Sequence, residues 1–410
     1  MNLSAFISKR IALNRQRTFS RFIIRLSIAA TALSVASMIL TLSFVNGFQF
    51  AVSQKVFSFW GHIRVQQAQP SQSLISEETP LKENDTVYQL LRNFPGVKQV
   101  QSYATKSAVA EHNKDIEGIL FKGVSSNYDF KNLQSFLVAG KWLDFTDSSY
   151  SRQIVVSKPI ADALNIHVND SINVFFISPD ATSSSVRKLQ VTGIYKTGID
   201  DYDKLFAIGD LRLLRKINNW KHGEIGGYEI FLDDYTQMDT ISYQLHGELP
   251  LRWESHTIRE MYPNIFDWLN ILDVNRNVIF IIMAIVAIIN LITCLLILVL
   301  ERIRMVGILK SMGASDWMIQ KIFLYHAVII AGMGVFIGLA AGLGIYFLQK
   351  YTGFIKLDEA NYYVSVAPVS VEAWDVFLIC LATMVVCLVS LLLPTLFVRS
   401  VKPVKAIRFR

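Results

Sequence analysis

Few residues in this sequence have the types and spacing that catalysis requires. The pair Gly140-Lys141 is followed by Trp142 and lacks the upstream glycine of a phosphate-binding loop. No other segment fits that motif, so we expect no ATP site in the chain. The seven histidines show neither an H-E-x-x-H motif nor clustered ligand spacing. We therefore expect a protein that is not an enzyme and that holds no cofactor or metal of its own.

Two groups of titratable residues leave alternatives open. Asp200, Asp201 and Asp203 form an acidic turn that could bind calcium or could simply be a solvated loop. His326 lies near one end of a long apolar run and could relay protons, whereas a packed or interfacial histidine would have no such role. Neither group defines a reaction.

A charged turn at 301–321, with the sequence ERIRMVGILKSMGASDWMIQK, lies between two apolar runs. Charged side chains cost about 2.5–3.5 kcal/mol each inside a bilayer, so the turn must lie outside it. Gly313 is placed to end a first helix in the left-handed conformation. Ser315 or Asp316 can then cap a second helix that starts near Trp317. Two helices that meet at a rigid corner can receive force from another protein; the alternative is a solvated loop that only joins two spans.

The chain is too apolar for an ordinary soluble enzyme, because 52% of its residues are hydrophobic and its mean hydropathy is +0.34. Four runs are long enough to cross about 30 Å of hydrocarbon as helices. They are residues 26–45, 278–300, 322–348 and 376–398. A cleaved signal peptide is the alternative for the first run, but its 20 uncharged residues exceed a signal-peptide core. The sequence therefore predicts a polytopic membrane protein.

Basic residues predict the orientation in the membrane. Residues 1–25 carry six basic residues and no acid, and residues 399–410 carry five and no acid. By the positive-inside rule both termini should be cytoplasmic. The net charge of +7 is then a signal of membrane topology and does not suggest nucleic acid as a partner. All three cysteines fall in predicted spans, so we expect no disulfide in the large outer segment.

The predicted fold is an α-helical membrane protein with four transmembrane helices and a large two-lobed α/β domain outside the cytoplasm. The predicted membrane-associated segments are an interfacial elbow helix on membrane lipids at 1–21 and spans at 22–46, 274–300, 322–348 and 376–398. The predicted segments between and after them are an outer domain at 47–273, the charged turn at 301–321, an outer loop at 349–375 and a cytoplasmic tail at 399–410.

Alternating and helical patterns divide the outer domain into an α/β lobe at 47–125 and 227–262 and an inserted β-rich lobe at 126–226. The α/β lobe should contain extended segments at 61–67, 97–110, 116–124, 228–232 and 251–255 and helices at 86–93 and 238–249. The insert should contain a helix at 157–164, strands at 171–177 and 187–195, and a hairpin tip at 178–186. A helix at 264–277 should run into the second span.

The third predicted span carries a packing signal, because Gly334, Gly338 and Gly342 recur every four residues. Glycines on one face of a membrane helix allow another backbone to approach closely. We therefore expect a close helix partner, although the motif does not identify it.

Nine segments resemble the FtsX-like permeases of ABC transporters, and most closely the lipoprotein-releasing LolC and LolE family. In the membrane part the segments are FISKRIALNRQRTFSRFI, LSFVNGF at 42–48 and ERIRMVGILKSMGAS, followed by the glycine-rich third span and the basic PVKAIRFR end. In the outer domain FLVAGKWLDF, IVVSKPIADALNIHVNDSINV, LFAIGDLRLL and GYEIFLDD resemble successive blocks of that family's periplasmic domain. The resemblance covers the whole chain.

The resemblance implies a permease of the bacterial inner membrane that passes force from a separate ATPase to its periplasmic domain. A LolD-type ATPase dimer, which binds ATP and magnesium, would dock beneath two permease subunits, and the second subunit would be a LolC/LolE-like partner or a copy of this chain. The cargo would be a lipoprotein. The implied ATPase-coupling residues are Glu301, Arg302, Arg304, Met305, Gly307, Lys310, Gly313, Ala314 and Ser315.

The sequence departs from the family at two places. Met305 stands where many relatives carry an acidic residue, and the tip at 178–186 is short beside the LolC hook that recruits the periplasmic carrier LolA. The implied carrier-facing residues are Pro179, Asp180 and Ser184. Two other functions stay open: an FtsX-like scaffold that activates a cell-wall hydrolase, and a MacB-like efflux permease.

Overall fold

The computed structural model describes residues 19–68, 80–82, 84–146, 149–177 and 184–390. Most of the predicted elbow at 1–21, the tail at 399–410, and Pro179 and Asp180 lie outside the described residues. The chain divides into two compact units. The first comprises Met1–Phe50, Trp268–Lys356 and Val366–Arg410, and the second comprises Ala51–Asp267 and Leu357–Ser365.

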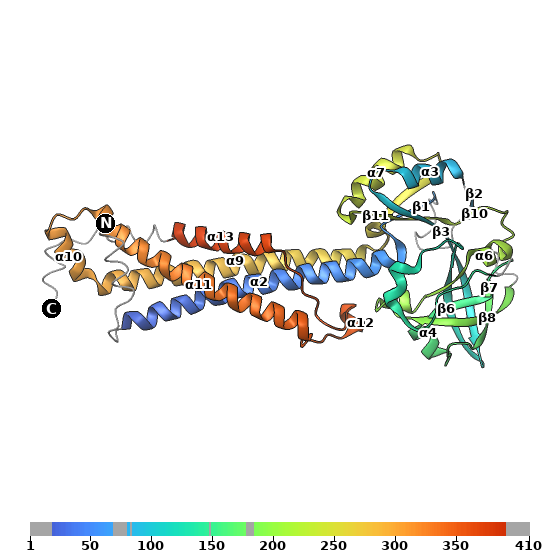
Figure 1. Ribbon diagram of the computed structural model, residues 1–410, viewed down its shortest axis with the longest axis horizontal. Coiled ribbons are helices and arrows are strands. Elements are labelled where there is room, and N and C mark those ends of the chain that lie inside the picture. The colour runs from blue at the N-terminus through green and yellow to red at the C-terminus, as the bar shows by residue number, and fades with distance from the viewer. Residues whose placement is uncertain (1–18, 69–79, 83, 147–148, 178–183, 391–410) are drawn as a thin grey trace. The chain divides into compact units, whose positions relative to one another are not determined.

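The first unit is a bundle of long helices (Figure 1). It contains most of α2 (Phe19–Trp60) and of α9 (Pro263–Glu301), together with α10 (Ile303–Ser311), α11 (Asp316–Thr352) and α13 (Ala373–Ser390). Four of these helices, all but α10, are long and apolar enough to cross a membrane, which confirms the predicted number of spans. Residues 391–398 of the fourth predicted span lie outside the described residues. The second predicted span and the helix expected at 264–277 are one continuous helix, α9.

The glycine stripe of α11 packs against α2. A Cβ atom added to Gly334 would lie 2.7 Å from Cβ of Thr31, and one added to Gly338 would lie 2.6 Å from the carbonyl oxygen of Ala32. A Cβ on Gly342 would lie 3.2 Å from Cβ of Ile39. The close helix partner that the motif does not identify is therefore the first span, whose small residues match the missing side chains.

Replacing Gly338 with valine should destabilise the bundle, because its Cβ would have to displace the backbone of α2. Overpacking of this kind typically costs about 1–3 kcal/mol, and backbone contacts relax less easily than side chains do. We expect a clear drop in the thermal unfolding midpoint of the protein in detergent. Gly344→Val is the matched control, because a Cβ at Gly344 meets nothing within 4 Å. Equal midpoints for the two variants would contradict the packing assigned to the stripe.

The second unit is a mixed α/β domain built on a ten-stranded sheet with the order β12-β1-β11-β3-β4-β9-β6-β8-β5, in which β7 pairs with β3 and β8 (Figure 1). The first strands are β1 (Ile63–Gln67), β3 (Val97–His112), β4 (Asp115–Val124), β5 (Leu137–Gly140) and β6 (Gln153–Ser157). The others are β7 (Ser171–Ile177), β8 (Ser184–Tyr195), β9 (Phe206–Asp210), β11 (Gly227–Leu232) and β12 (Trp253–Thr257). A separate pair joins β2 (Leu81–Lys82) to β10 (Glu224–Ile225).

Short helices accompany the sheet. They are α3 (Asp85–Asn93), α4 (Lys158–Ala163), α5 (Asp200–Asp203), α6 (Leu211–Ile217), α7 (Met238–Glu248), α8 (Ile258–Met261) and α12 (Glu359–Tyr362). Two 3-10 helices, η1 (Phe130–Phe136) and η2 (Tyr235–Gln237), join them. Ser157 and Thr257 begin α4 and α8 by accepting hydrogen bonds from the backbone amides of Ile160 and Glu260, so local capping fixes where these helices start.

The strands of the two predicted lobes share one sheet. Strand β4 of the α/β lobe pairs in parallel with β9 of the insert, and β3 pairs with β7 of the insert. The strand predicted at 171–177 is confirmed as β7. The strand predicted at 251–255 is wrong by two residues, because Arg252 adopts a left-handed φ of 80° in the turn before β12.

The acidic turn at Asp200 to Asp203 is a short helix rather than a solvated loop. Asp203 is buried, and its carboxylate accepts hydrogen bonds from the backbone amides of Thr197 and Gly198, each at 2.9 Å. Burial raises the pKa of this carboxyl group above its ordinary value, although these hydrogen bonds oppose the shift. The expectation of a solvated loop is wrong for Asp203, which instead fixes the turn that precedes it.

Helix α2 enters the sheet with almost no linker. The amide of Gly61, which has a φ of +73°, donates to the carbonyl oxygen of Phe57 at 2.8 Å and so ends the helix. The amide of His62 donates to Ile230 of β11 at 2.8 Å, and β1 begins at the next residue. Within the domain the end of α2 is therefore fixed directly to two strands.

A buried ion pair holds this helix end. The ammonium of Lys122 lies 2.7 Å from the carboxylate of Glu229, and both side chains are fully buried. The same ammonium donates to the carbonyl oxygen of Phe59 at 2.5 Å and lies 4.2 Å from the ring centroid of Trp60. Helix carbonyls attract cations, so Lys122 closes the last turn of α2 while neutralising Glu229.

Candidate functional site

The charged turn forms a rigid corner between α10 and α11. The amide of Ala314 donates to Leu309 at 2.9 Å, and the amide of Gly313 donates to Lys310 at 3.0 Å. Together with the φ of +88° at Gly313, these bonds define a Schellman motif and confirm the predicted left-handed position. The hydroxyl of Ser315 then caps α11 by accepting from the amide of Met318 at 3.3 Å.

A second break, at Arg302, was not predicted. Helix α9 ends at Glu301 and α10 begins at Ile303, and Arg302 between them has a φ of −100° and a ψ of 17°. The amide of Arg302 still donates to Leu298 at 3.2 Å, so the chain turns without losing helical contact. The sequence offers no glycine or proline here to mark the break. Helix α10 is thus held between two turns, the break at Arg302 and the corner at Gly313.

One side of α10 packs into the helix bundle. Val306 and Gly307 are buried, and Met305 and Ala314 pack with Ile319 against the cluster that α9 and α11 build. Three residues of the implied coupling set, Met305, Gly307 and Ala314, therefore lie on the packed side. Their position makes the corner move with the bundle rather than swing independently of it.

The other side of the corner is open and combines charged with apolar residues. Glu301, Arg304, Gly313 and Ser315 are exposed. Between the two sides, the Lys310 side chain is only 9% exposed and its ammonium lies 2.9 Å from the carboxylate of Asp316, so this ion pair joins α10 to α11. Some of the implied coupling residues therefore pack into the bundle, and others are exposed at the corner.

Three large apolar side chains at the corner were missed in the sequence. Ile308, Met312 and Trp317 are 52%, 78% and 55% exposed, and they lie in the charged segment between two spans, outside the apolar runs. Their signal was present as apolar residues flanking Gly313 inside a charged segment. A charged rim around exposed apolar residues is typical of a surface that binds another protein.

The bundle also contains an apolar groove of about 360 Å³. It is lined by Met38 of α2, Phe280 and Ala284 of α9, and Leu378 and Val386 of α13. Asn46 of α2 donates to Asp375 of α13 at 3.5 Å and so marks one end of the two helices. At 1.5 Å of rise per residue, the α13 side of the groove lies roughly 5–16 Å from that end.

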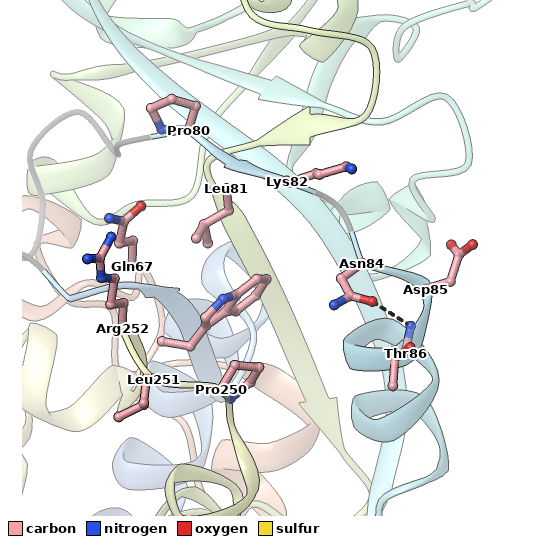
Figure 2. Close-up of a pocket in the computed structure, with 11 residues that line it drawn as sticks. Gln67, Pro80, Leu81, Lys82, Asn84, Asp85, Thr86, Pro250, Leu251 and Arg252 are labelled. Carbon is pink, nitrogen blue, oxygen red and sulfur yellow. Dashed lines mark hydrogen bonds between the residues drawn. The ribbon is translucent and has the colours of Figure 1, made fainter.

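A hollow of about 660 Å³ lies in the domain beside β2 and β12 (Figure 2). Leu81, Lys82, Asp85 and Arg252 are among its lining residues, and Asn84 at its edge caps α3 by accepting from the amide of Thr86 at 2.9 Å. Apolar, acidic and basic side chains are mixed around it, without a paired nucleophile and base among the described lining residues. The hollow can offer a binding surface, and it has no arrangement for a reaction.

The hairpin implied as carrier-facing is present as the pair β7 and β8. Ile177 pairs with Ser184 at its outer end, and the pairing continues inward to Ser171 and Gln190. Of the implied carrier-facing residues only Ser184 lies among the described residues. No group of His, Cys, Asp or Glu residues in the described part of the chain is placed to hold a metal ion.

Four membrane-crossing helices and a mixed α/β domain between the first two define a polytopic membrane protein with a large domain outside the membrane. Residues 26–242 match the MacB-like periplasmic core domain, and residues 277–403 match the FtsX-like permease C-terminal region. The chain therefore belongs to the FtsX-like permeases that carry a MacB-like periplasmic core domain.

Relatives of similar length support the same class. The lipoprotein-releasing system transmembrane protein LolC of Neisseria meningitidis is 23% identical, over 100% of this chain and 99% of that protein. LolE of Haemophilus influenzae is 22% identical over 99% of each chain. From these two relatives and the family matches, the chain is an ABC-transporter permease of a bacterial inner membrane, and a subunit of this kind is not itself the ATPase. Among solved structures, the periplasmic region of MacB from Actinobacillus actinomycetemcomitans is 12% identical, covering 50% of this chain and 91% of that one with a TM-score of 0.35.

Proposed function

We propose that this permease releases lipoproteins from the inner membrane and is driven by a separate LolD-type ATPase dimer that docks on the corner between α10 and α11. The observation that carries the proposal is the corner itself. Its Schellman turn fixes the angle between two helices, its inner side is part of the bundle core, and its outer side presents Ile308, Met312 and Trp317. Such a surface can both bind a partner and pass on its movement.

In the proposed mechanism ATP and magnesium are bound by the partner. The sequence has no phosphate-binding loop, so this chain would contribute only the mechanical steps. Closure of the ATPase dimer would push the exposed apolar residues of the corner. Helix α11 starts at Asp316, directly after the corner, and runs without a break to Thr352, so it would carry the displacement across the membrane.

The groove between α2, α9 and α13 is the proposed contact for acyl chains of the cargo. Its wall is made almost entirely of aliphatic and aromatic groups, which suits hydrocarbon and excludes a polar substrate. The LolC and LolE relatives are described as parts of a lipoprotein-releasing system, and a lipoprotein carries such chains. A second permease subunit, either LolC/LolE-like or a copy of this chain, and the periplasmic carrier LolA complete the proposal.

Reconstitution tests this function. The permease complex is purified with its ATPase and placed in vesicles that contain an acylated lipoprotein, and released lipoprotein is measured with and without ATP. We expect release only with ATP, and no ATP hydrolysis by the single chain. Hydrolysis without release, combined with activation of a cell-wall hydrolase, would favour the FtsX-like scaffold. ATP-driven export of small molecules alone would favour the MacB-like efflux permease.

The proposal requires both termini and the corner to be cytoplasmic. In a version without the three native cysteines, a cysteine in place of exposed Asp115 should react with a membrane-impermeant thiol reagent added to the outside of spheroplasts. A cysteine in place of exposed Ser311 should react only after the membrane is opened. The positive-inside rule gives this direction, and the opposite labelling pattern would overturn it.

A further inference from the structure

The loop between α11 and α13 is fastened to the last turn of α11. The side-chain amide of Gln349, which is buried, donates to the carbonyl oxygen of Ala367 at 2.9 Å and accepts from the amide of Ile355 at 3.0 Å. The amide of Ala367 in turn donates to Ile355 at 3.0 Å. The side chain of Gln349 therefore holds both ends of the loop, at Ile355 and at Ala367. The base of the loop is thus fixed to α11.

The tip of the same loop belongs to the other compact unit. Leu357–Ser365 groups with the domain, and it contains the short helix α12. Glu359 at the start of α12 pairs with Lys196, which follows β8, and lies 3.6 Å from the ammonium of Lys55. Lys55 also donates to the carbonyl oxygen of Tyr363 at 2.7 Å. Two lysines from distant parts of the domain thus contact the loop tip at 357–365.

A turn of the domain at Gly198 leaves space for the carboxylate of Glu359. Gly198 has a φ of +77°, and a Cβ at this position would collide with the carboxylate of Glu359 and lie 2.7 Å from the ammonium of Lys55. The backbone amide of Gly198 donates a hydrogen bond to the carboxylate of Asp203, which fixes this turn. On the loop, Tyr363 has a φ of +60°, a conformation that residues other than glycine rarely adopt. A side chain at position 198 would close the site, so the turn leaves room for Glu359.

The electrostatic environment agrees with a lasting contact. The hydrogen bond to Glu359 raises the pKa of Lys196 above its ordinary value. The side chains of Glu359 and Lys55 are only 27% and 21% exposed, so water screens their attraction less than it screens an ion pair on an open surface. Isolated surface pairs contribute little, but here one carboxylate pairs with two ammonium groups, and one of these, that of Lys55, also donates to the backbone carbonyl oxygen of Tyr363.

We propose that Glu359 is a positioning residue that fastens the α11–α13 loop to the domain, so that α11 has a link of its own to the domain besides the continuous helices α2 and α9. This inference rests on the proposed function in one respect, since it gives α11 a route by which the movement of the corner reaches the domain. The contact is an ion pair of the Glu359 carboxylate with Lys55 and Lys196, and the absence of a side chain at Gly198 leaves room for it.

The first test measures amide hydrogen exchange of the loop tip at 357–365 in the full chain in detergent. Removing the charge in Glu359→Gln should speed exchange of these amides about five- to tenfold. In the Glu359→Gln background, Lys196→Gln should add nothing, because both changes break the same pair. Asp162→Asn is the control, since it breaks the exposed pair with Lys158 in the same unit. Unchanged exchange in Glu359→Gln, or additive effects of the two substitutions, would overturn the link.

The second test uses the reconstituted complex and measures lipoprotein released per ATP hydrolysed. We expect Glu359→Gln to lower this ratio at least about threefold while hydrolysis continues, and Glu359→Asp, which keeps the charge, to restore part of it. A merely structural loss of folded complex would lower release and hydrolysis together. If the wild type releases nothing, the proposed function fails, while the exchange experiment still decides the link. If the wild type releases lipoprotein and Glu359→Gln keeps the normal ratio, the coupling role of Glu359 is wrong.

Discussion

Gly313→Val is expected to reach the membrane in normal amount and to lose most ATP-driven release. The φ of +88° at this residue is costly for any side chain by about 1–2 kcal/mol, and more for a β-branched one. Nothing lies within 4 Å of an added Cβ, so the cost arises from the backbone and not from a clash. A free-energy cost of this size lowers the population of the native corner conformation by a factor of roughly ten or more. Hydrolysis by the partner should then continue without release, or the partner should no longer bind.

The matched control is Gly344→Val in α11. This position also has open space around a Cβ, but its backbone is helical, so valine meets neither a clash nor a left-handed φ. We expect normal release per ATP from this variant. Normal release from Gly313→Val as well would mean that the corner is only a connector between two spans.

The second large effect is expected at the end of α2. Lys122→Met should lower the free energy of unfolding by about 3–5 kcal/mol, because it leaves the carboxylate of Glu229 buried without its partner. The carbonyl oxygen of Phe59 loses its donor in the same step. Thermal unfolding of the protein in detergent, followed by tryptophan fluorescence, measures the effect.

Two further variants separate the ion pair from general packing. Lys122→Met combined with Glu229→Met removes both charges and should recover most of the loss, since apolar groups of similar shape replace a buried pair almost without cost. Lys131→Met removes a lysine that is 89% exposed and pairs with Asp129 at 3.5 Å, so it should change stability very little. A double variant as unstable as Lys122→Met alone would contradict a stabilising role for neutralisation of Glu229.

Local signals predicted the parts of the fold that depend on neighbouring residues. Apolar runs predicted the four spans, alternation predicted β7, and Gly313 predicted the corner because only a residue without a side chain easily adopts its φ. Ser315 predicted the start of α11 for a similar reason, since its hydroxyl reaches an amide three residues ahead.

Contacts between distant residues could not be predicted in this way. Lys122 and Glu229 lie in strands separated by a third strand, and each looks like an ordinary surface residue in its own segment. Glu359 lies in a polar stretch whose sequence gives no sign of Lys55 or Lys196. The glycine stripe predicted a close partner but not α2, because small residues permit approach without specifying which helix approaches. The burial of Asp203 was not predicted because nearby acidic residues suggest solvent, whereas backbone amides of Thr197 and Gly198 donate hydrogen bonds to its carboxylate.

The most direct measurement of the corner's role is site-specific photo-crosslinking in intact cells. A photo-reactive residue in place of Met312, the most exposed apolar residue of the corner, should form an adduct with a P-loop ATPase that mass spectrometry identifies. The same residue in place of Tyr243, equally exposed on α7 of the domain, should not capture that ATPase. An adduct with the ATPase at Met312 alone is the predicted result. Absence of the ATPase from every Met312 adduct, or its capture from Tyr243, would contradict the proposal that the corner receives the force of ATP hydrolysis.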